Sequence, residues 1–445
     1  MRCLFVMIVA GMLLAGCGTE MKKADPKLLT DVSLLHQNIG ELRDVLILDM
    51  FSPPVSSRIF SYTSLAAYEA LKFEKVGQPS FTAHLQGFPQ MPEPERGKTY
   101  NYLMAATKAF FMVAEKITFS KDSLIQYENG VYAGFKSLLD AETYNRSMQF
   151  GERIGAKILE RTAIDMYKET RGMPRFIGVD EKGKWRPTPP DYMDAAEPNW
   201  AKIKPLLLDS LSQIACPLPP PYSEDTTSAF FKTAVEVYTI GKNLTEEQKE
   251  IAKYWDDNPF VIEHSGHLMY GNKKITPVAH WIGITTIACK KETASALKSA
   301  EAYALASIAM HDVIIACWEQ KYKLQHVRPV TVINDLMDRN WQPFLQTPPF
   351  PEHSSGHSAI SASVATVLTG LFGNHVSFED TSDMKFIGMK RNFQSFNQAA
   401  QEASMSRVYG GIHYRTGIDA GAIQGRRVGD LVLQRFLIDP VTAAK

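Results

Sequence analysis

Apolar residues recur every three or four positions over most of this 445-residue chain, and this spacing restricts the fold more than any other feature. It places apolar side chains along one face of a helix, whereas a half-buried strand needs strict alternation. The N-terminal segments with helical spacing are 34–50, 57–73, 99–117, 121–139 and 142–167. We find no convincing alternating strand. The sequence therefore predicts an all-α protein made of helical bundles, long enough for two layers or domains.

A proline-rich stretch divides the chain. Residues 168–221 break the helical pattern and are rich in Pro, Gly, Asp and Trp. Such a stretch is either a linker or an ordered loop that crosses one face of a bundle. Helical spacing resumes at 228–241, 245–255, 277–287, 291–320, 358–371, 384–404 and 418–436. We expect an N-terminal helical region over 31–215 and a C-terminal helical domain over 222–445.

The N-terminus has the organisation of a targeting segment. Arg2 precedes an apolar run over 4–14, and the tetrapeptide Leu-Ala-Gly-Cys ends at Cys17. The run is too short to span a bilayer comfortably, which favours a cleaved signal peptide over 1–17. The tetrapeptide resembles the bacterial lipobox, which implies lipidation of Cys17 and a tether over 18–30. The alternative is a plain secretory signal with an incidental cysteine. We expect a protein of the bacterial cell envelope, lipid-anchored and facing the periplasm or the exterior.

The charge composition indicates no charged macromolecular partner. Lys plus Arg number 48 and Asp plus Glu number 48, so the formal net charge is zero. This balance argues against nucleic acid, and it leaves the lipid anchor as the expected contact with a membrane. A homodimer stays open. Any cationic site must be a local concentration of charge.

The cysteines add little to this interpretation. Beyond the N-terminal segment the chain has Cys216, Cys289 and Cys317, an odd number that cannot all pair within one chain. Their spacing matches no metal motif. Cys289 and Cys317 stand in apolar helical patterns, so we expect them to be buried as small hydrophobic residues.

Three short clusters carry polar side chains suited to catalysis. The first is Lys321, followed seven residues later by Arg328 and Pro329. Seven residues is about two helical turns, so both cations could share one helix face at the end of the segment 291–320. Pro329 biases the chain away from helix. Converging Lys and Arg side chains suit an anion, although two cations at a helix end usually only favour the helix dipole.

The second cluster surrounds a Ser-Gly-His triplet. Ser355, Gly356 and His357 directly precede an apolar helix face over 358–371, so Ser355 or Ser354 is expected at the N-cap. The free N–H groups of a helix N-terminus bind anions, and Gly356 lets an anion approach the backbone closely. His357 could exchange a proton near neutral pH. A simple N-cap with a surface histidine is nearly as good an explanation for this cluster alone.

The third cluster is Ser406-Arg407, a double glycine, and His413. Arg407 and His413 flank Gly410 and Gly411, where the backbone can turn and direct both side chains to one place. A histidine presented in this way can be a nucleophile or a ligand of a metal-like centre.

Together, the order Lys-x6-Arg-Pro, Ser-Gly-His and Ser-Arg-x5-His resembles the three-part signature of the type 2 phosphatidic acid phosphatase and vanadium haloperoxidase superfamily. The resemblance covers the chain from Lys321 onward. It implies a helical-bundle fold and an oxyanion site. In that site Lys321, Arg328 and Arg407 would neutralise the anion, and Ser355 and the Gly356 amide would bind its oxygens. It implies that His357 is the acid–base group and His413 the nucleophile toward phosphorus or the axial ligand of vanadium.

Two positions depart from the family pattern. An Asp commonly follows the last histidine of the signature by four residues and orients its ring, but this chain has Gly417 there. Asp419, two residues further on, is a candidate substitute. The family often has Pro just before Ser-Gly-His, where this chain has Ser354.

Two histidine pairs offer a competing metal site. A second Ser-Gly-His at 265–267 is preceded by His264, so His264 and His267 stand at i, i+3 spacing. No third ligand is obvious nearby, which favours a structural loop. His353 and His357 stand at i, i+4 spacing, but the helix is expected to begin only near Gly356. We rank both below the oxyanion interpretation.

The oxyanion site fits two activities. As a phosphatase, the enzyme would need no cofactor, and His413 would attack a phosphoester while His357 protonates the leaving alcohol. As a haloperoxidase, it would hold vanadate on His413 and oxidise a halide with hydrogen peroxide, with His357 assisting. We favour the haloperoxidase because its members are long, soluble and all-α, and because Phe350 and Trp318 resemble aromatic residues on its halide side. Ordinary packing is the alternative for both aromatics, and a non-catalytic oxyanion-binding lipoprotein is the third hypothesis.

Overall fold

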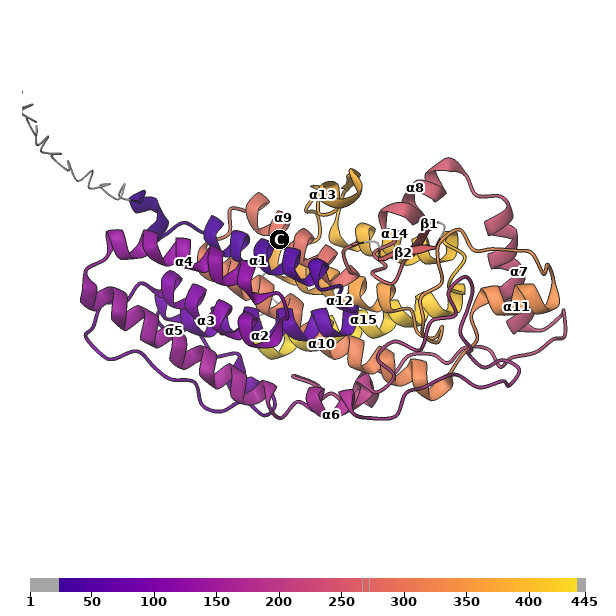
Figure 1. The fold of residues 1–445 in the computed structure, drawn as a ribbon, viewed down its shortest axis with the longest axis horizontal. Coiled ribbons are helices and arrows are strands. Elements are labelled where there is room, and N and C mark those ends of the chain that lie inside the picture. Colours follow the sequence, from indigo (N-terminus) through magenta and orange to yellow (C-terminus); the bar gives the residue numbers. More distant parts are fainter. Residues whose placement is uncertain (1–23, 266, 272, 438–445) are drawn as a thin grey trace, which may run out of the picture.

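The computed structural model describes residues 24–265, 267–271 and 273–437. The predicted signal peptide and Cys17 therefore lie outside the described residues. Within them helices predominate and strands are few and short, which confirms the all-α prediction (Figure 1).

The N-terminal half is a bundle around α2, a helix whose residues are all buried. Side-chain caps fix where several helices begin: Asn101 accepts from the Met104 amide and Asp140 from the Thr143 amide, both at 2.8 Å. The helices are α1 (Ser33–Leu48), α2 (Pro53–Leu71), α3 (Tyr102–Ile117), α4 (Lys121–Leu138), α5 (Ala141–Thr162) and the short α6 (Tyr167–Arg171). The last part of the predicted tether belongs to this fold, because Pro26–Leu29 form a 3-10 helix against α4.

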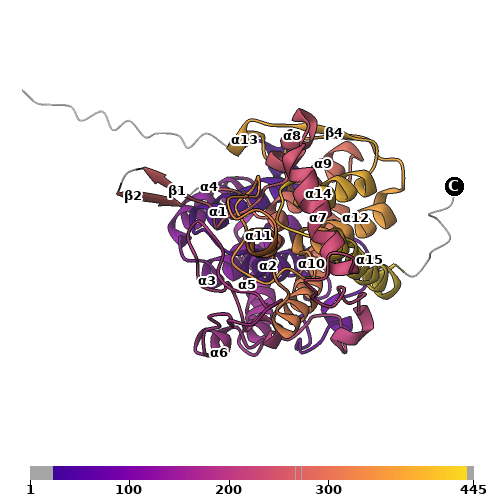
Figure 2. The ribbon, with the colours of Figure 1, turned by 90° about the vertical axis from the view of Figure 1, so that its right-hand side faces the viewer.

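The C-terminal half contains the remaining helices and two small hairpins, which sequence periodicity did not predict. The helices are α7 (Ala229–Lys242), α8 (Glu246–Tyr254), α9 (Pro277–Lys291), α10 (Ala296–Leu324), α11 (Pro329–Leu336), α12 (Gly356–Phe372), α13 (Met384–Ile387), α14 (Phe396–Tyr409) and α15 (Arg415–Phe436). The antiparallel hairpins pair β1 (Ile262–Ser265) with β2 (Leu268–Gly271), and β3 (Phe378–Asp380) with β4 (Arg391–Phe393). The hairpin β1–β2 projects from the body of the molecule (Figure 2).

The expected single helix over 384–404 is wrong. Helix α13 ends after one turn at Gly388, whose φ of 70° lies in the left-handed region that favours glycine. Strand β4 follows, and α14 starts anew at Ser395, whose hydroxyl caps the Gln398 amide at 3.1 Å. Local turn chemistry therefore outweighs the apolar spacing in this segment.

Helix α10 joins the two halves. It packs against α2 on one side and against α12 and α15 on the other. Among the described residues, it is the helix that is long and apolar enough to cross a membrane, yet nearly all of it is buried inside the protein, as expected of a core helix. One hydrophobic core runs from Leu34 to Phe436 across both halves. The boundaries at 215 and 222 stay predictions.

Helices α12 and α15 lie so close together that their backbones are in contact. Gly421 and Gly425 stand one turn apart on α15, facing α12. A Cβ added at Gly421 would overlap the carbonyl oxygen of Ser355, and one at Gly425 would overlap that of Ala359. Since any side chain here would push the helices apart, glycine fixes how closely the start of α12 lies to α15.

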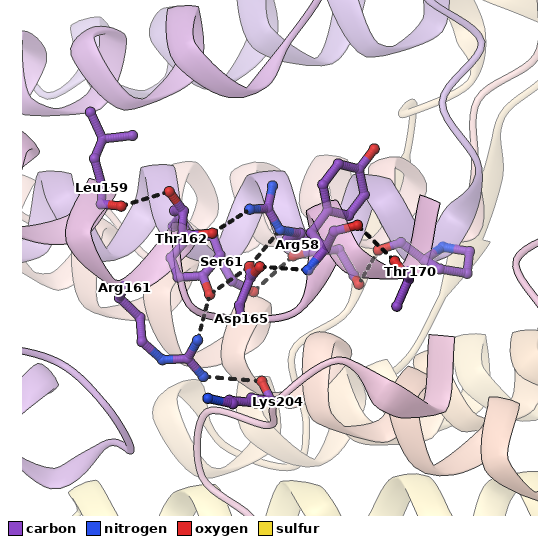
Figure 3. Close-up of polar contacts among 12 residues, drawn as sticks. Arg58, Ser61, Leu159, Arg161, Thr162, Asp165, Thr170 and Lys204 are labelled. Atoms are coloured by element: carbon purple, nitrogen blue, oxygen red, sulfur yellow. Dashed lines mark hydrogen bonds and ion pairs between the residues drawn. The ribbon is translucent and has the colours of Figure 1, made fainter. Parts of the chain in front are cut away.

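The proline-rich stretch is an ordered loop that buried charges anchor (Figure 3). Arg58 donates to Asp165 at 2.6 Å, and the Tyr62 hydroxyl donates to the same carboxylate oxygen at 3.0 Å. Arg161 donates to the carbonyls of Lys204 and Pro205, both at 3.1 Å. In addition, the Asp312 carboxylate on α10 accepts from the backbone amides of residues 206–208. The stretch is thereby fixed along the bundle.

We predict that Asp165→Asn destabilises the protein by about 3–5 kcal/mol, because it leaves the buried Arg58 without its counter-ion. Chemical denaturation followed by circular dichroism measures the change. The matched control is Asp194→Asn, which breaks an exposed pair with Arg175 and should leave unfolding unchanged. Equal unfolding midpoints for the two variants would contradict a stabilising role for the buried Arg58–Asp165 pair.

Candidate active site

A small cavity lies at the N-terminus of α12, where the three sequence clusters meet. His357, Arg407 and His413 line it, together with Gly356. These residues come from α12, from α14 and from the turn before α15, which are far apart in the sequence. The structure therefore brings the Ser-Gly-His cluster and the Ser-Arg-x5-His cluster to one place.

Ser355 caps α12, as the sequence predicted. Its hydroxyl oxygen accepts from the Ser358 amide at 3.3 Å and from the Ser358 hydroxyl at 3.1 Å. These contacts leave the hydroxyl hydrogen of Ser355 available to donate. Gly356 presents its backbone to the cavity, with the Trp318 ring as the nearest neighbour of an added Cβ at 3.5 Å. The positive end of the helix thus faces the cavity, and the Ser355 hydroxyl lies at its N-cap.

His357 has a free ring nitrogen. The ring bonds to the backbone of Asp256, while Nε2 is buried and has no hydrogen-bond partner among the described residues. Burial, together with the charges of Arg407 and His280, holds the pKa of His357 well below its ordinary value. The ring is therefore neutral at neutral pH, and its unpartnered nitrogen can accept a proton.

The two arginines carry buried donors that the described residues leave unpartnered. Arg407 donates through Nη1 to the backbone carbonyls of Trp255 and Asp256, but its Nε and Nη2 have no partner. Arg328 donates to the Phe350 carbonyl at 2.9 Å, and its Nη2 has no partner. Buried guanidinium nitrogens rarely stay unpaired. An oxyanion in the cavity would satisfy them.

His413 faces Arg328. Arg328 Nη1 lies 3.1 Å from His413 Nε2, so this ring nitrogen is the acceptor and carries a lone pair. Burial and the nearby cations, Arg328 first, hold the pKa of His413 well below its ordinary value. A neutral ring with its lone pair on Nε2 suits a nucleophile or a metal ligand.

Lys321 is close to the site but has no free donor. Its ammonium donates to the carbonyls of Pro351 at 2.9 Å, Glu352 at 3.0 Å and Ser354 at 2.6 Å. Burial lowers its pKa to about 8. Lys321 therefore supplies positive charge and holds the loop that precedes α12.

The expected helix face shared by Lys321 and Arg328 is wrong. Helix α10 ends at Leu324, and Gln325 adopts a left-handed φ of 54°. Arg328 instead stands at the N-cap of α11, and Pro329 opens that helix. Pro329 begins a helix here because the first turn needs no N–H donor.

Phe350 and Trp318 form an apolar wall of the cavity. Their ring centroids lie 5.1 Å apart, and Phe260 approaches Phe350 at 6.3 Å. The Lys321 ammonium lies 4.9 Å from the centre of the Phe350 ring, a cation–π distance. Both aromatics that the sequence singled out therefore lie at the site.

Sequence analysis missed Glu352, which takes the place expected of Asp419. Asp419 is exposed, whereas the Glu352 carboxylate lies 2.7 Å from His413 Nδ1 and also accepts from the Tyr414 amide at 3.2 Å. A Cβ added at Gly417 would overlap this carboxylate. Gly417 has no side chain where the family commonly has an Asp. The Glu352 side chain, which belongs to the Ser-Gly-His cluster, occupies that space.

Ser354 and Ser355 join the two motifs. The Ser354 hydroxyl donates to Gln424 Oε1 on α15 at 2.5 Å, and the Ser355 amide donates to the Gly417 carbonyl at 3.0 Å. These bonds fasten the start of α12 to the start of α15. They complement the glycine contacts between the two helices.

The alternative metal sites find no support in the part of the chain that the structure describes. It contains no group of three or more His, Cys, Asp or Glu side chains arranged to hold a metal ion. His267 is exposed, and the side chain of His264 lies outside the described residues. His353 does not line the cavity, and its Nε2 lies 3.8 Å from the Cys216 thiol. All three described cysteines are free, and Cys289 and Cys317 are buried as predicted.

Comparison with known proteins agrees with this geometry. The family model VCPO second helical-bundle domain matches residues 301–438. A solved structure described as the first bacterial vanadium-dependent iodoperoxidase is 40% identical, with a TM-score of 0.87, and the match covers 93% of this chain and 98% of that one. The holo and apo forms of a bacterial vanadium-dependent chloroperoxidase share the fold at 17% and 16% identity. Their TM-scores are 0.69 and 0.68, and the matches cover 88% and 87% of this chain and 94% of each of theirs. No curated protein matches the chain.

The fold and the cavity define a helical-bundle enzyme with an oxyanion site. The chain belongs to the vanadium-dependent haloperoxidase family, within the superfamily that includes the type 2 phosphatidic acid phosphatases. The haloperoxidase interpretation of the sequence is thereby confirmed.

We predict that moving the carboxylate from Glu352 to position 417 restores a damaged site. Glu352→Ala should lower vanadate affinity and halide oxidation by about 10- to 100-fold, because His413 loses the partner of its Nδ1 hydrogen. Adding Gly417→Asp in this background should recover most of the loss. Vanadate titration and steady-state kinetics measure both effects.

Gly417→Asp alone is the matched control, and it should impair the enzyme because its side chain overlaps Glu352. A double variant no better than Glu352→Ala would contradict the exchange of carboxylates.

Proposed function

We propose that this haloperoxidase oxidises iodide with hydrogen peroxide at a vanadate held by His413. The unpartnered buried guanidinium nitrogens of Arg328 and Arg407 and the free Nε2 of His357 carry this proposal, because Arg407 and His357 line the cavity and Arg328 contacts His413 in its wall. The choice of iodide rests on the relative described as an iodoperoxidase, at 40% identity over nearly all of both chains.

The residues present fit vanadate. Arg328 Nη2 and the Nε and Nη2 atoms of Arg407 would donate to its oxygens, together with the Ser355 hydroxyl and the Gly356 amide. Lys321 would add positive charge close to the anion, and its hydrogen bonds hold the loop before α12 in place. Once bound, vanadate supplies an electrophilic centre that activates hydrogen peroxide toward a halide.

Two histidines divide the remaining work. His413 would bind vanadium through Nε2, while Glu352 fixes the proton on Nδ1 and the orientation of the ring. His357, neutral and with Nε2 free, would accept a proton from hydrogen peroxide and return it as the reduced oxygen leaves as water.

The apolar wall of Phe350, Trp318 and Phe260 would exclude water on the halide side of the cavity. Iodide is the largest and most easily oxidised of the three halides to be compared, and it is weakly hydrated. A partly apolar entrance therefore suits iodide better than chloride.

We also propose that Cys17 is lipidated and anchors the enzyme in the bacterial cell envelope. The support is the apolar run followed by Leu-Ala-Gly-Cys, which resembles a lipobox. Expression of the full chain with Cys17→Ala, followed by separation of membrane and soluble fractions, tests the anchor. Equal amounts of wild type and variant in the membrane fraction would refute it.

We predict that His413→Ala abolishes halide oxidation and that Arg407→Ala weakens vanadate binding by about 10- to 100-fold, since it removes charged hydrogen bonds. Calorimetric titration with vanadate and peroxide-dependent iodide oxidation measure the two effects. Full turnover by His413→Ala would refute the mechanism.

Comparison of the halides tests the choice of substrate. Purified protein without residues 1–17 should oxidise iodide in the presence of vanadate and peroxide, with bromide and chloride much poorer, and phosphate should inhibit by competing for the cavity. Release of phosphate from p-nitrophenyl phosphate without any halide oxidation would instead assign a phosphatase.

A further inference from the structure

A buried row of three ionisable side chains lies behind the cavity wall. His280 on α9 places Nδ1 3.0 Å from both carboxylate oxygens of Asp257 and Nε2 3.0 Å from Asp380 Oδ2. All three side chains are fully buried or nearly so. Asp257 follows α8, and Asp380 ends β3. Three separate elements therefore meet at one imidazole ring.

The row requires a charged imidazole. A carboxylate at each ring nitrogen can be satisfied only if both nitrogens carry hydrogen. Burial alone would lower the pKa of His280, but Asp257 and Asp380 together raise it well above its ordinary value. Trp255 stacks on the ring with centroids 4.5 Å apart, which further suits a cation. At neutral pH the row holds one positive and two negative charges.

Other charged groups surround this row. Asp383 lies next to it, and burial and the Asp257 carboxylate raise the pKa of Asp383 to about 7. The further ionisable groups around the row are the Asp256–Lys274 ion pair, Tyr254, Arg407 and His357.

The row is joined to the catalytic cavity through residues 255–257. Asp257 lines the cavity with Arg407 and His357. The carbonyls of Trp255 and Asp256 accept from Arg407 Nη1, and Asp256 also bonds to the His357 ring. The backbone at Asp257 has a left-handed φ of 40°, which a non-glycine residue adopts only where its surroundings hold it.

We propose that His280 is a positioning residue of the active site. Clamped between Asp257 and Asp380, it fixes the segment 255–257, whose carbonyls direct Arg407 and His357 into the oxyanion cavity. This inference rests on the proposed function in so far as the anion is vanadate. Asp257 is the member that touches the cavity wall, and Asp380 keeps the imidazole charged.

Substitution of His280 by Asn or by Gln tests its two hydrogen bonds separately. An Asn side-chain amide at position 280 replaces the Nδ1 hydrogen and keeps the bond to Asp257. A Gln amide replaces the Nε2 hydrogen and keeps the bond to Asp380 alone. We expect His280→Gln to weaken the binding of vanadate, and of inorganic phosphate, by at least about tenfold, and His280→Asn by less than about threefold. Calorimetric titration without peroxide or halide measures both.

His311→Gln is the matched control. His311 on α10 is equally buried, but it packs beside Tyr62 of the N-terminal helix α2 and not at the row. It should leave anion binding unchanged. If His280→Gln does not fold, Asp380→Asn takes its place: without the outer carboxylate His280 loses its charge and holds Asp257 less tightly, so anion binding should weaken, and wild-type affinity in folded Asp380→Asn would equally overturn the proposal. Wild-type affinity in folded His280→Gln would overturn the proposal. Failure of every row variant to fold, with His311→Gln folded, would also overturn it, because the row would then serve stability alone.

The proposed function can fail separately. A wild-type protein that binds vanadate or phosphate without oxidising halide would refute the haloperoxidase activity, while the order of the His280 variants would still decide the positioning role. A wild type that binds neither anion would refute both.

Discussion

The backbone contact between α12 and α15 is the constraint on which the active site depends. A helix N-terminus binds an anion only if the other ligands lie at the correct distance, and here those ligands come from the turn before α15 and from α14. Gly421 and Gly425 let the two helices touch, and the bond from the Ser355 amide to the Gly417 carbonyl fixes their ends. The first turn of α12, with Gly356 and His357, and the turn before α15, with His413, thus reach one cavity because no side chain separates the two helices.

The second constraint is electrostatic. Lys321, Arg328 and Arg407 are all fully buried, and taking each cation out of water costs several kcal/mol unless partners offset it. Backbone carbonyls, and for Lys321 and Arg328 the nearby Glu352 carboxylate, offset part of this cost. The unpartnered guanidinium nitrogens still need hydrogen-bond acceptors, and a bound oxyanion would supply them. Perturbed and incompletely paired groups of this kind are characteristic of functional sites.

Sequence alone predicted those parts of the site that are encoded locally. The N-cap at Ser355 follows from three adjacent residues and the helix behind them, and the position of Phe350 follows from its closeness to that motif. Glu352 was missed because its partner, His413, is 61 residues away. Only the structure shows that the Glu352 carboxylate occupies the space that a side chain at Gly417 would take. His280 was missed because Asp257 reaches it from the loop after α8 and Asp380 from strand β3, both far from it in the sequence. Likewise, the helix predicted over 384–404 failed because a turn at Gly388 outweighs apolar spacing.

The most direct measurement is a crystal structure of the protein soaked with vanadate, with anomalous data collected at the vanadium absorption edge. We expect one vanadium peak in the cavity, bonded to His413 Nε2, with its oxygens on Arg328, Arg407 and the Ser355–Gly356 end of α12. A vanadium peak elsewhere, or an empty cavity at saturating vanadate, would contradict the central claim that these buried donors form an oxyanion site.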